Sequence, residues 1–326
     1  MRVREVGEFS LIERITRAAA RGGAVQAGPA VVVGTGDDAA VLRLPRGHDV
    51  LVSTDALVEG VHFRWPTQSP QTVGQRALLV ALSDLAAMGV RPLGCTLALA
   101  APASLELSQA LGIARGVGAV AARARCPLVG GNVTRSRVTS LTVTVLGSAP
   151  PGRFLSRSAA RAGDGIFVTG QLGVAALALA GSERRGRRLR HLPPLRLAAG
   201  LALTRLPGRG ACIDLSDGLL ADLGHLLQAS GAGAEVWVPS VPLRPGFAQA
   251  CKRLRLAPLR TALTAGEDYE LLFTLRPGGL GPRALSRRLG VRVTQIGRVT
   301  RRAGLHLAGG PKGFSVGASA LGFEHF

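Results

Sequence analysis

The 326-residue chain combines 47% hydrophobic residues with a formal net charge of +20. This length allows two domains with a core each, and glycine and proline are spread along the whole chain, so the composition indicates a globular protein and excludes a disordered one. No apolar run approaches the roughly 20 residues of a membrane span. The four cysteines form no Cys-x-x-Cys pair of the kind that holds zinc. We therefore expect a cytoplasmic protein with no membrane partner.

The positive charge lies mainly in the second half of the chain. Residues 1–150 hold 15 arginines against 10 acids, whereas residues 151–326 hold 25 lysines and arginines against 10 acids. The densest run, residues 184–190, precedes two prolines and is interpreted as a solvated loop. A nucleic-acid-binding protein would combine such cations with aromatic stacking platforms, yet only 4% of the residues are aromatic. Nucleic acid is thus disfavoured as a partner, and a basic nucleic-acid-binding protein remains the alternative from another functional class.

The apolar pattern of the first half predicts alternating helices and strands. Ser10 and Glu13 have the spacing of a capping box, which predicts that an amphipathic helix opens there. Further helices are predicted over residues 74–88 and 107–124. Strands are predicted over residues 31–33, 41–44, 50–52, 93–100 and 141–146.

A Pro-Pro-Gly stretch at residues 150–152 interrupts the pattern and predicts a domain boundary. The expected division is an N-terminal domain over residues 1–150 and a C-terminal α/β domain over residues 151–326. Because strands and helices mix in both halves, the predicted class is α/β in the broad sense, or mixed α+β. In the second half, helices are predicted over residues 173–180, 195–204 and 218–229, and strands over 166–169, 211–215, 235–238, 271–275 and 292–296.

Acidic residues are scarce, and six of the ten aspartates fall in four short segments. Some of these segments follow predicted strands, where side chains are free to face a ligand. Carboxylate and hydroxyl oxygens suit Mg²⁺, which takes one or two carboxylates together with substrate phosphates and water. The alternative is that each aspartate only caps a helix or a turn. The four segments are residues 34–41, 53–63, 83–89 and 214–218.

Two common nucleotide-binding motifs are excluded. The glycines of residues 34–39 fit the spacing of a dinucleotide fingerprint, but Asp37 and Asp38 would meet the pyrophosphate and a strand follows where that motif needs a helix. Neither lysine follows a P-loop glycine pattern. Any ATP chemistry must therefore neutralise the phosphates with metal ions and arginines.

Eight segments together resemble a known family, the thiamine-monophosphate kinases of the aminoimidazole ribonucleotide synthetase-like superfamily. Their order and spacing fit from residue 7 to residue 326. Each segment alone is a weak or moderate signal, whereas the ordered set is specific. The segments are GEFSLIERI (7–15), GDDAAV (36–41), STDALVEGVHF (53–63), SDLAAMG (83–89), GGNVTRS (130–136), IDLSDGLLADLGHLL (213–227), GEDYELLF (266–273) and GFEHF (322–326).

This resemblance implies a two-domain fold in which residues 1–150 bind ATP and metal and pair with a second copy of the chain. The two N-terminal domains would form an intersubunit β-barrel, giving a homodimer with each active site in a cleft between domains. The implied reaction is the ATP-dependent phosphorylation of thiamine monophosphate to thiamine diphosphate by direct, Mg-assisted, in-line phosphoryl transfer. The implied cofactors are several Mg²⁺ ions, with ATP as co-substrate and a requirement for a monovalent cation left open.

The resemblance also implies roles for individual residues, carried over at matching motif positions. Thiamine carries a cationic thiazolium, which a carboxylate or an aromatic face could balance. From the residues alone, His62 could equally be a packed histidine, Phe323 a core residue and Glu267 part of a solvated acidic turn. The implied metal ligands are Asp38, Ser53, Thr54, Asp55, Asp84, Asn132, Asp214 and Asp217, with Asp38, Asp55, Asp84 and Asp214 catalytic; ATP contacts are Gly131, Asn132, Arg157 and Ser216; substrate contacts are His62, Glu267 and Phe323.

One position departs from the family. The usual Gly-Gly-Asp-Thr motif is replaced by a sequence that carries Asn132 and Val133. An asparagine can offer a carbonyl oxygen to Mg²⁺ but adds no charge, so it should hold an ion less tightly. Two alternatives therefore stay open: another ATP-dependent enzyme of the superfamily, forming an amidine or closing a ring on a phosphorylated metabolite, and a relative without catalytic activity.

Overall fold

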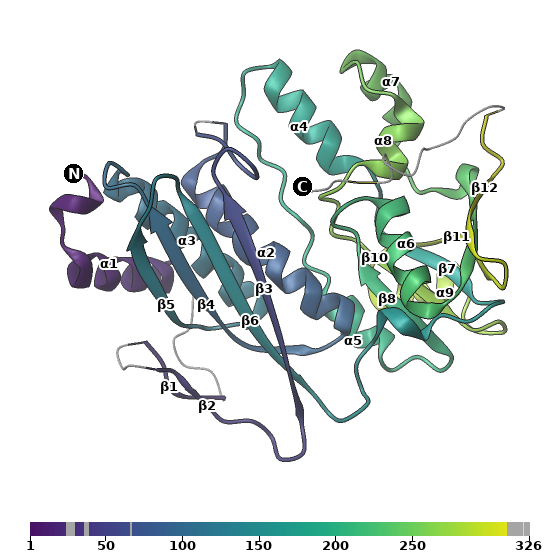
Figure 1. The fold of residues 1–326 in the computed structure, drawn as a ribbon, viewed down its shortest axis with the longest axis horizontal. Helices are drawn as coiled ribbons and strands as arrows, with labels where there is room; N and C mark the ends of the chain where they lie inside the picture. Colours follow the sequence, from purple (N-terminus) through teal and green to yellow (C-terminus); the bar gives the residue numbers. More distant parts are fainter. Residues whose placement is uncertain (24–29, 36–38, 66, 312–321, 323–326) are drawn as a thin grey trace. The chain divides into compact units, whose positions relative to one another are not determined.

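The fold is described from a computed structural model, for all residues except 24–29, 36–38, 66, 312–321 and 323–326. The chain forms two compact units (Figure 1). Unit 1 comprises Met1–Leu85, Val90–Gly152 and Arg185–Leu195, and unit 2 comprises Ala86–Gly89, Arg153–Arg184 and Arg196–Phe326. The functional roles expected of residues 1–150 and 151–326 stay predictions.

Unit 1 is built on a four-stranded sheet in the order β3-β6-β4-β5. Strand β6 pairs antiparallel with β3 and β4, whereas β4 and β5 are parallel. A small antiparallel pair, β1 with β2, lies outside this sheet. The elements are η1 (Val3–Glu5), α1 (Glu8–Arg21), β1 (Val31–Val33), β2 (Val41–Leu42), β3 (Asp49–Val58), α2 (Pro70–Met88, its last turn assigned to unit 2), β4 (Arg91–Ala101), α3 (Leu107–Ala124), β5 (Leu128–Arg135) and β6 (Ser140–Ala149).

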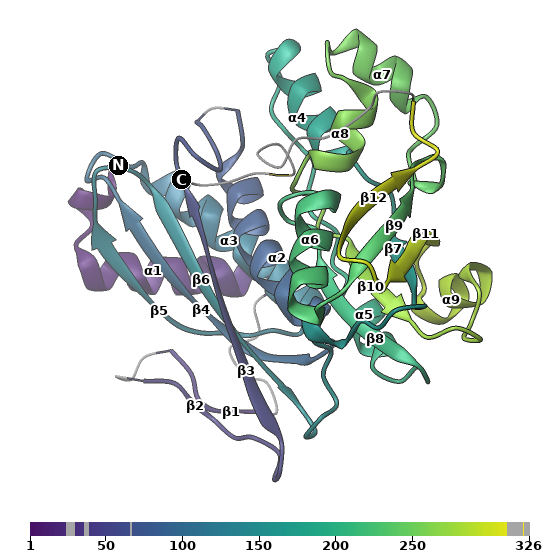
Figure 2. The same cartoon turned by 45° about the vertical axis from the view of Figure 1, so that its right-hand side comes forward.

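Helices α2 and α3 cover one face of this sheet (Figures 1 and 2). Alternate strand residues such as Leu57, Leu97 and Val143 are buried on that face. On the opposite face Val50 and Val52 are 44% and 64% exposed. The sheet of one chain is therefore open on one side and does not close into a barrel.

The two covering helices approach each other closely because glycines form their contact. A Cβ atom at Gly116 of α3 would lie 2.1 Å from the carbonyl oxygen of Gln71 in α2, and one at Gly74 of α2 would lie 2.0 Å from that of Ile113 in α3. Both atoms are backbone, so neither can move aside alone. The glycines cost helix propensity, and the close packing of α2 on α3 offsets that cost.

Adding a methyl group at this contact should separate the helices. We expect Gly116→Ala to lower the free energy of unfolding by about 1–3 kcal/mol, the usual cost of overpacking, although alanine is the better helix former. The matched control is Gly224→Ala, since Gly224 lies in α6 and a Cβ atom there meets nothing within 4 Å. That control should raise stability by about 0.5–1 kcal/mol. Thermal and urea unfolding measure both; equal effects of the two substitutions would contradict the packing argument.

Unit 2 is built on a six-stranded sheet in the order β12-β9-β11-β7-β10-β8, in which only β12 and β9 are parallel. Its elements are η2 (Arg157–Ala159), β7 (Gly165–Thr169), α4 (Val174–Arg184), α5 (Leu197–Leu203), β8 (Arg209–Asp214), α6 (Leu219–Ser230), β9 (Gly233–Trp237), η3 (Val238–Ser240), α7 (Phe247–Arg253), α8 (Pro258–Thr264), β10 (Leu271–Leu275), α9 (Pro282–Leu289), β11 (Val293–Thr300) and β12 (Gly304–Ala308).

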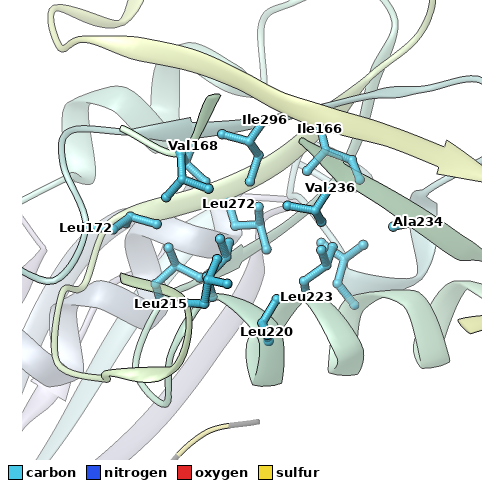
Figure 3. Packing of buried hydrophobic residues seen from close by; sticks show 14 of the residues in the cluster. Ile166, Val168, Leu172, Leu215, Leu220, Leu223, Ala234, Val236, Leu272 and Ile296 are labelled. Atoms are coloured by element: carbon cyan, nitrogen blue, oxygen red, sulfur yellow. The ribbon is translucent and has the colours of Figure 1, made fainter. Parts of the chain in front are cut away.

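The core of unit 2 lies between this sheet and α6 (Figure 3). Ile166, Leu272 and Ile296 of the sheet face Leu220 and Leu223 of the helix, and all five side chains are buried. This packing holds the start of α6 against the end of β8. The turn that joins these two elements is thereby fixed in place, and it carries part of the candidate site.

Most predicted elements are present, with differences that have physical causes. The helix at residues 107–124 and the strand at 271–275 match as predicted. The predicted start at Ser10 is wrong, because α1 begins at Glu8 after an N-cap at Gly7. The strand predicted at residues 50–52 continues to Val58, since β6 pairs with it along its whole length. Strands β5 and β12 and helices α7, α8 and α9 were not predicted.

Candidate active site

In unit 1, the structure brings together Ser53 and Asp55 of β3 and Asp84 of α2, here called the unit 1 cluster. Ser53 and Asp55 lie two positions apart in a strand, so their side chains share a face, and this face is the one covered by α2. The Ser53 hydroxyl donates a hydrogen bond to Asp84 Oδ2. Asp55 was predicted to follow a short strand but lies inside β3, whereas Asp84 lies inside a helix, as predicted.

The unit 1 cluster carries unbalanced negative charge. Burial, and after it the charge of Asp84, raises the pKa of Asp55 to about 6. Within the described part of the chain, neither Asp55 nor Asp84 forms an ion pair with a basic side chain. Two carboxylates and a hydroxyl without a counter-charge are the donor set that Mg²⁺ takes in phosphate sites. The residues present therefore fit a magnesium ion.

Other predicted ligands of unit 1 lie away from this cluster. Thr54 is on the opposite face of β3, where its hydroxyl is 2.9 Å from that of Thr144. In the sheet, Asn132 of β5 is paired with Ala98 of β4, and the same row of paired residues reaches Ala56 of β3. Ala56 and Thr54 lie two positions apart in β3, so Asn132 is on the same face of the sheet as Thr54. Three strand spacings, about 14 Å, separate β5 from β3. Within one chain, Asn132 does not join Asp55.

Two more predicted residues of unit 1 have clear positions. Gly131 is on β5 in the row of Leu97, where a Cβ atom would lie 2.1 Å from the Leu97 carbonyl oxygen. His62 follows β3, and its Nδ1 accepts a hydrogen bond from the Val58 amide at 3.0 Å. The His62 carbonyl in turn accepts one from Arg76. Through these two hydrogen bonds, His62 connects the end of β3 to α2.

In unit 2, Asp214, Ser216 and Asp217 occupy the turn between β8 and α6. Asp214 ends the strand, as predicted, and is only 4% exposed. Asp222, one turn into α6, folds back so that its carboxylate accepts hydrogen bonds from the amides of Asp217 and Gly218, both at 3.1 Å. Burial, then Asp217 and Asp214, raises the pKa of Asp222 to about 7. These three aspartates and Ser216 are called the unit 2 cluster.

Asp222 was not predicted as a functional residue, although it belongs to the segment that carries the resemblance. An aspartate in the first turn of a helix, five positions after another aspartate, is a weak signal on its own, because exposed helices often carry such residues. Its near-complete burial marks it, since an aspartate 2% exposed in an apolar core needs a reason. Its two hydrogen bonds give that reason: Asp222 fixes the turn that presents Asp217.

The segment Gly266–Glu270 lies against the unit 2 cluster. The Glu267 amide donates a hydrogen bond to the Ser216 carbonyl at 2.8 Å, so the predicted substrate residue is fixed beside the predicted ATP residue. Arg157, the predicted ATP-binding arginine, is exposed in η2, and the carbonyl of the neighbouring Ser156 accepts from the amide of Cys212 in β8. Arg157 thus lies on a segment that runs beside the strand ending at Asp214.

Two predicted residues, Asp38 and Phe323, fall outside the described residues. Among the residues that are described, no group of three or more His, Cys, Asp or Glu side chains gathers in a way that could hold a metal by itself. Each cluster thus offers too few protein ligands for a closed metal site. Such an arrangement suits an ion that completes its shell with substrate phosphates and water.

In the described part of the chain, no helix is both long and apolar enough to cross a membrane.

Asp268 provides a pH test of the packing beside the unit 2 cluster. Burial raises the pKa of Asp268 from 3.8 to about 7, although three backbone amides donate to it. A raised pKa means that its contribution to stability is complete below about pH 4 and is lost as the pH rises through 7. We expect the advantage of the wild type over Asp268→Asn to shrink over that window by an amount on the order of 4 kcal/mol.

The measurement is urea unfolding from pH 4 to pH 8, followed through Trp237 of unit 2 in a Trp65→Phe background. The matched control is Asp49→Asn, a substitution of an exposed residue, which should change the free energy of unfolding by no more than about 0.5 kcal/mol. A wild-type advantage over Asp268→Asn that is constant or grows toward pH 7 would contradict the assignment.

Comparison with known proteins identifies the family. Residues 36–149 match the family model "AIR synthase related protein, N-terminal domain". A solved thiamine-monophosphate kinase from Stenotrophomonas maltophilia K279a is 35% identical, with a TM-score of 0.78 over 93% of this chain and 97% of that one. The structure of AaThiL complexed with AMPPCP and TMP is 30% identical, with a TM-score of 0.74 over 100% of this chain and 99% of that one.

The same relationship is clear from sequence alone. The thiamine-monophosphate kinase of Synechococcus elongatus is 37% identical over 306 residues, which cover 89% of this chain and 91% of that protein. Similarity of this extent includes parts of both units. The chain belongs to the thiamine-monophosphate kinase family.

Proposed function

We propose that the protein transfers the γ-phosphoryl group of ATP to thiamine monophosphate and so forms thiamine diphosphate. The observation that carries this proposal is the match, over the whole chain, to a relative whose structure holds AMPPCP and TMP. The two acidic clusters support it, because each contains residues of the segments shared with the family. ATP and thiamine monophosphate are accordingly the small-molecule substrates.

The unit 1 cluster would hold Mg²⁺ through Ser53, Asp55 and Asp84, and the unit 2 cluster through Asp214 and Asp217. Bound Mg²⁺ supplies charge neutralisation for the phosphates of both reactants. Asp38 is proposed as a further ligand. Thr54 would have to contribute through its main-chain carbonyl, since its side chain lies on the other face of β3. Several ions are needed in this proposal because both substrates are anionic.

The protein's own groups have few chemical steps to perform in this reaction. A phosphate oxygen of the acceptor is already a nucleophile near neutral pH, so no general base is required. Arg157 and the amides near Ser216 would orient the ATP phosphates, while Gly131 and Asn132 would contact ATP from strand β5. Glu267, His62 and Phe323 would contact thiamine monophosphate. Catalysis would thus consist of positioning and electrostatic stabilisation.

A coupled assay of thiamine diphosphate formation tests the function. We expect the wild type to form product from ATP and thiamine monophosphate only when Mg²⁺ is present. Asp84→Asn and Asp214→Asn should each lower kcat by at least about 100-fold, the usual cost of removing one electrostatic stabiliser. Asp49→Asn is the matched control, because Asp49 lies on β3 but is exposed, and it should keep wild-type kcat. Thermal melting checks that all variants fold; near-normal kcat in Asp84→Asn or Asp214→Asn would refute the proposed ligands.

We also propose a homodimer in which the open face of the unit 1 sheet pairs with that of a second chain, forming the intersubunit β-barrel. Val50 and Val52 give this face an exposed apolar stripe beside the free edge of β3. A sheet edge with exposed valines is a site for further strand pairing unless another chain covers it. The cytoplasm, where ATP is available, is the proposed location.

The dimer prediction concerns Val52, which is 64% exposed in the single chain. Burying a charge at a subunit contact is unfavourable, so Val52→Asp should shift the protein from dimer to monomer. Val138→Asp is the control, since Val138 is 45% exposed but lies in the β5–β6 connection. Light scattering after size exclusion measures both masses. A monomeric wild type, or a Val52→Asp protein that remains dimeric, would contradict this arrangement.

A further inference from the structure

The arginine-rich run between α4 and α5 is only partly a solvated loop. Residues Arg185–Leu195 follow the end of α4 and belong to unit 1. Within them Leu189 is 6% exposed, and its amide donates a hydrogen bond to the Thr67 carbonyl at 2.8 Å. The segment is therefore fixed to the part of the chain that precedes α2, with one leucine buried and the arginines around it exposed.

A cavity of about 340 Å³ lies where this segment meets the start of α2. Arg188 and Arg190, which precede and follow the buried leucine, both line it. The helix start contributes four polar residues, Ser69, Gln71, Thr72 and Gln75. All of these residues belong to unit 1. Small-molecule sites in proteins have volumes of about 300–1,000 Å³, so this cavity has room for a compact ligand.

The lining of the cavity is positively charged. Among the described residues it contains two arginines and no acidic side chain. In the same part of the chain, neither Arg188 nor Arg190 forms an ion pair with a carboxylate. Arg196 differs, because Glu270 accepts two hydrogen bonds from it at 2.6 Å. Two guanidinium groups at one cavity without a counter-charge repel each other, and an anion bound there would offset that repulsion.

The start of α2 adds hydrogen-bonding groups but is not itself the site. Ser69 Oγ accepts a hydrogen bond from the Thr72 amide at 3.1 Å, and the two hydroxyl oxygens lie 2.8 Å apart. Ser69 thus caps the helix, so one of its first amides already has a partner. Gln71 and Gln75 lie four positions apart and share one side of the helix. Their side-chain amides can bind the polar part of a ligand without adding charge.

These groups indicate the class of ligand that the cavity fits. Guanidinium groups bind phosphate oxygens through paired hydrogen bonds, and two of them suit a ligand with two phosphoryl groups. No aromatic side chain is found among the described residues of the lining, so a nucleotide base would have no stacking partner. A compact diphosphate therefore matches the lining better than a nucleotide does.

The cavity is separate from the unit 1 cluster. Gln75 and Asp84 lie on the same helix, nine positions apart, which corresponds to roughly 14 Å along its axis. Gln71 lies one turn farther from Asp84, at roughly 20 Å. A ligand in the cavity would thus not occupy the position proposed for Mg²⁺.

We propose that this cavity is a second anion site of the protein, in which Arg188 and Arg190 bind a compact diphosphate. The site goes beyond the proposed function, since it lies apart from the acids that would hold the metal. A bound diphosphate holds the arginine-rich segment against the start of α2. Because the ligand binds only the folded chain, it stabilises the protein against unfolding.

Calorimetry with inorganic pyrophosphate tests the site, in magnesium-free buffer at about 0.15 M salt. Without Mg²⁺ the acidic clusters repel this ligand, so binding reports on basic groups. We expect Arg188→Gln and Arg190→Gln each to weaken binding by about 10-fold or more, the usual loss for one hydrogen-bonded charge. Arg187→Gln is the matched control, because Arg187 is exposed in the same run but does not line the cavity. It should change the affinity by no more than about 2-fold.

A second variant keeps the shape of the lining and reverses its electrostatic preference. Gln75→Glu replaces an amide by a carboxylate of nearly equal size, and it should weaken pyrophosphate binding by about 10-fold or more. Thermal melting without ligand checks that each variant folds. Three results would overturn the proposal: a wild type that does not bind pyrophosphate, an equal loss in Arg187→Gln, and an unchanged affinity in Gln75→Glu.

Kinase kinetics show whether the cavity is distinct from the active site. We expect Arg188→Gln and Arg190→Gln to form thiamine diphosphate with wild-type KM for both ATP and thiamine monophosphate. A raised KM for either substrate would assign the cavity to the active site and would also overturn the proposal of a second site.

Discussion

Like negative charges held close together are the constraint on which each of the two acidic clusters depends. Asp55 faces Asp84 in unit 1, and Asp222 lies close enough to Asp214 and Asp217 for their charges to raise its pKa. A chain with 40 basic residues has ample means to neutralise these acids. Arginines are used for that purpose elsewhere, as Arg196 is with Glu270. Within the described residues, Asp55 and Asp84 form no ion pair with a basic side chain, which would leave their charge to the Mg²⁺ ion proposed above.

The fold keeps these acidic residues close together because each cluster lies on rigid elements. In unit 1, the cluster spans a strand paired over ten residues and a helix of 19 residues. In unit 2, the turn is fixed from two sides, by Asp222 from α6 and by the segment Gly266–Glu270. Rigid placement matters because carboxylates that could relax apart would lose their affinity for a small divalent ion.

The sequence predicted most of the helices and strands, but it did not predict where each acidic residue lies within them. Asp214 was predicted at a strand end and lies there, because the β8 pattern and the glycine of the following turn are both local signals. Asp55 was placed beyond a short strand, since pairing with β6 is a long-range interaction that no local pattern reports. Long-range strand pairing also determines that Asn132 lies on the opposite face of the sheet, and it explains why strand β5 was not predicted. Helices α7 and α8 have only seven residues each, too few for a helical period to show.

The arginine-rich run has a consequence for how the chain assembles during synthesis. Residues Arg185–Leu195 belong to unit 1, although the chain on both sides of them belongs to unit 2. Leu189 is 6% exposed there, and its amide donates to the Thr67 carbonyl at 2.8 Å. A ribosome that has finished the first 152 residues has therefore not yet supplied all of unit 1. More than thirty further residues must be synthesised before Leu189, the last buried leucine of unit 1, is present. The two units therefore cannot complete their folding strictly one after the other.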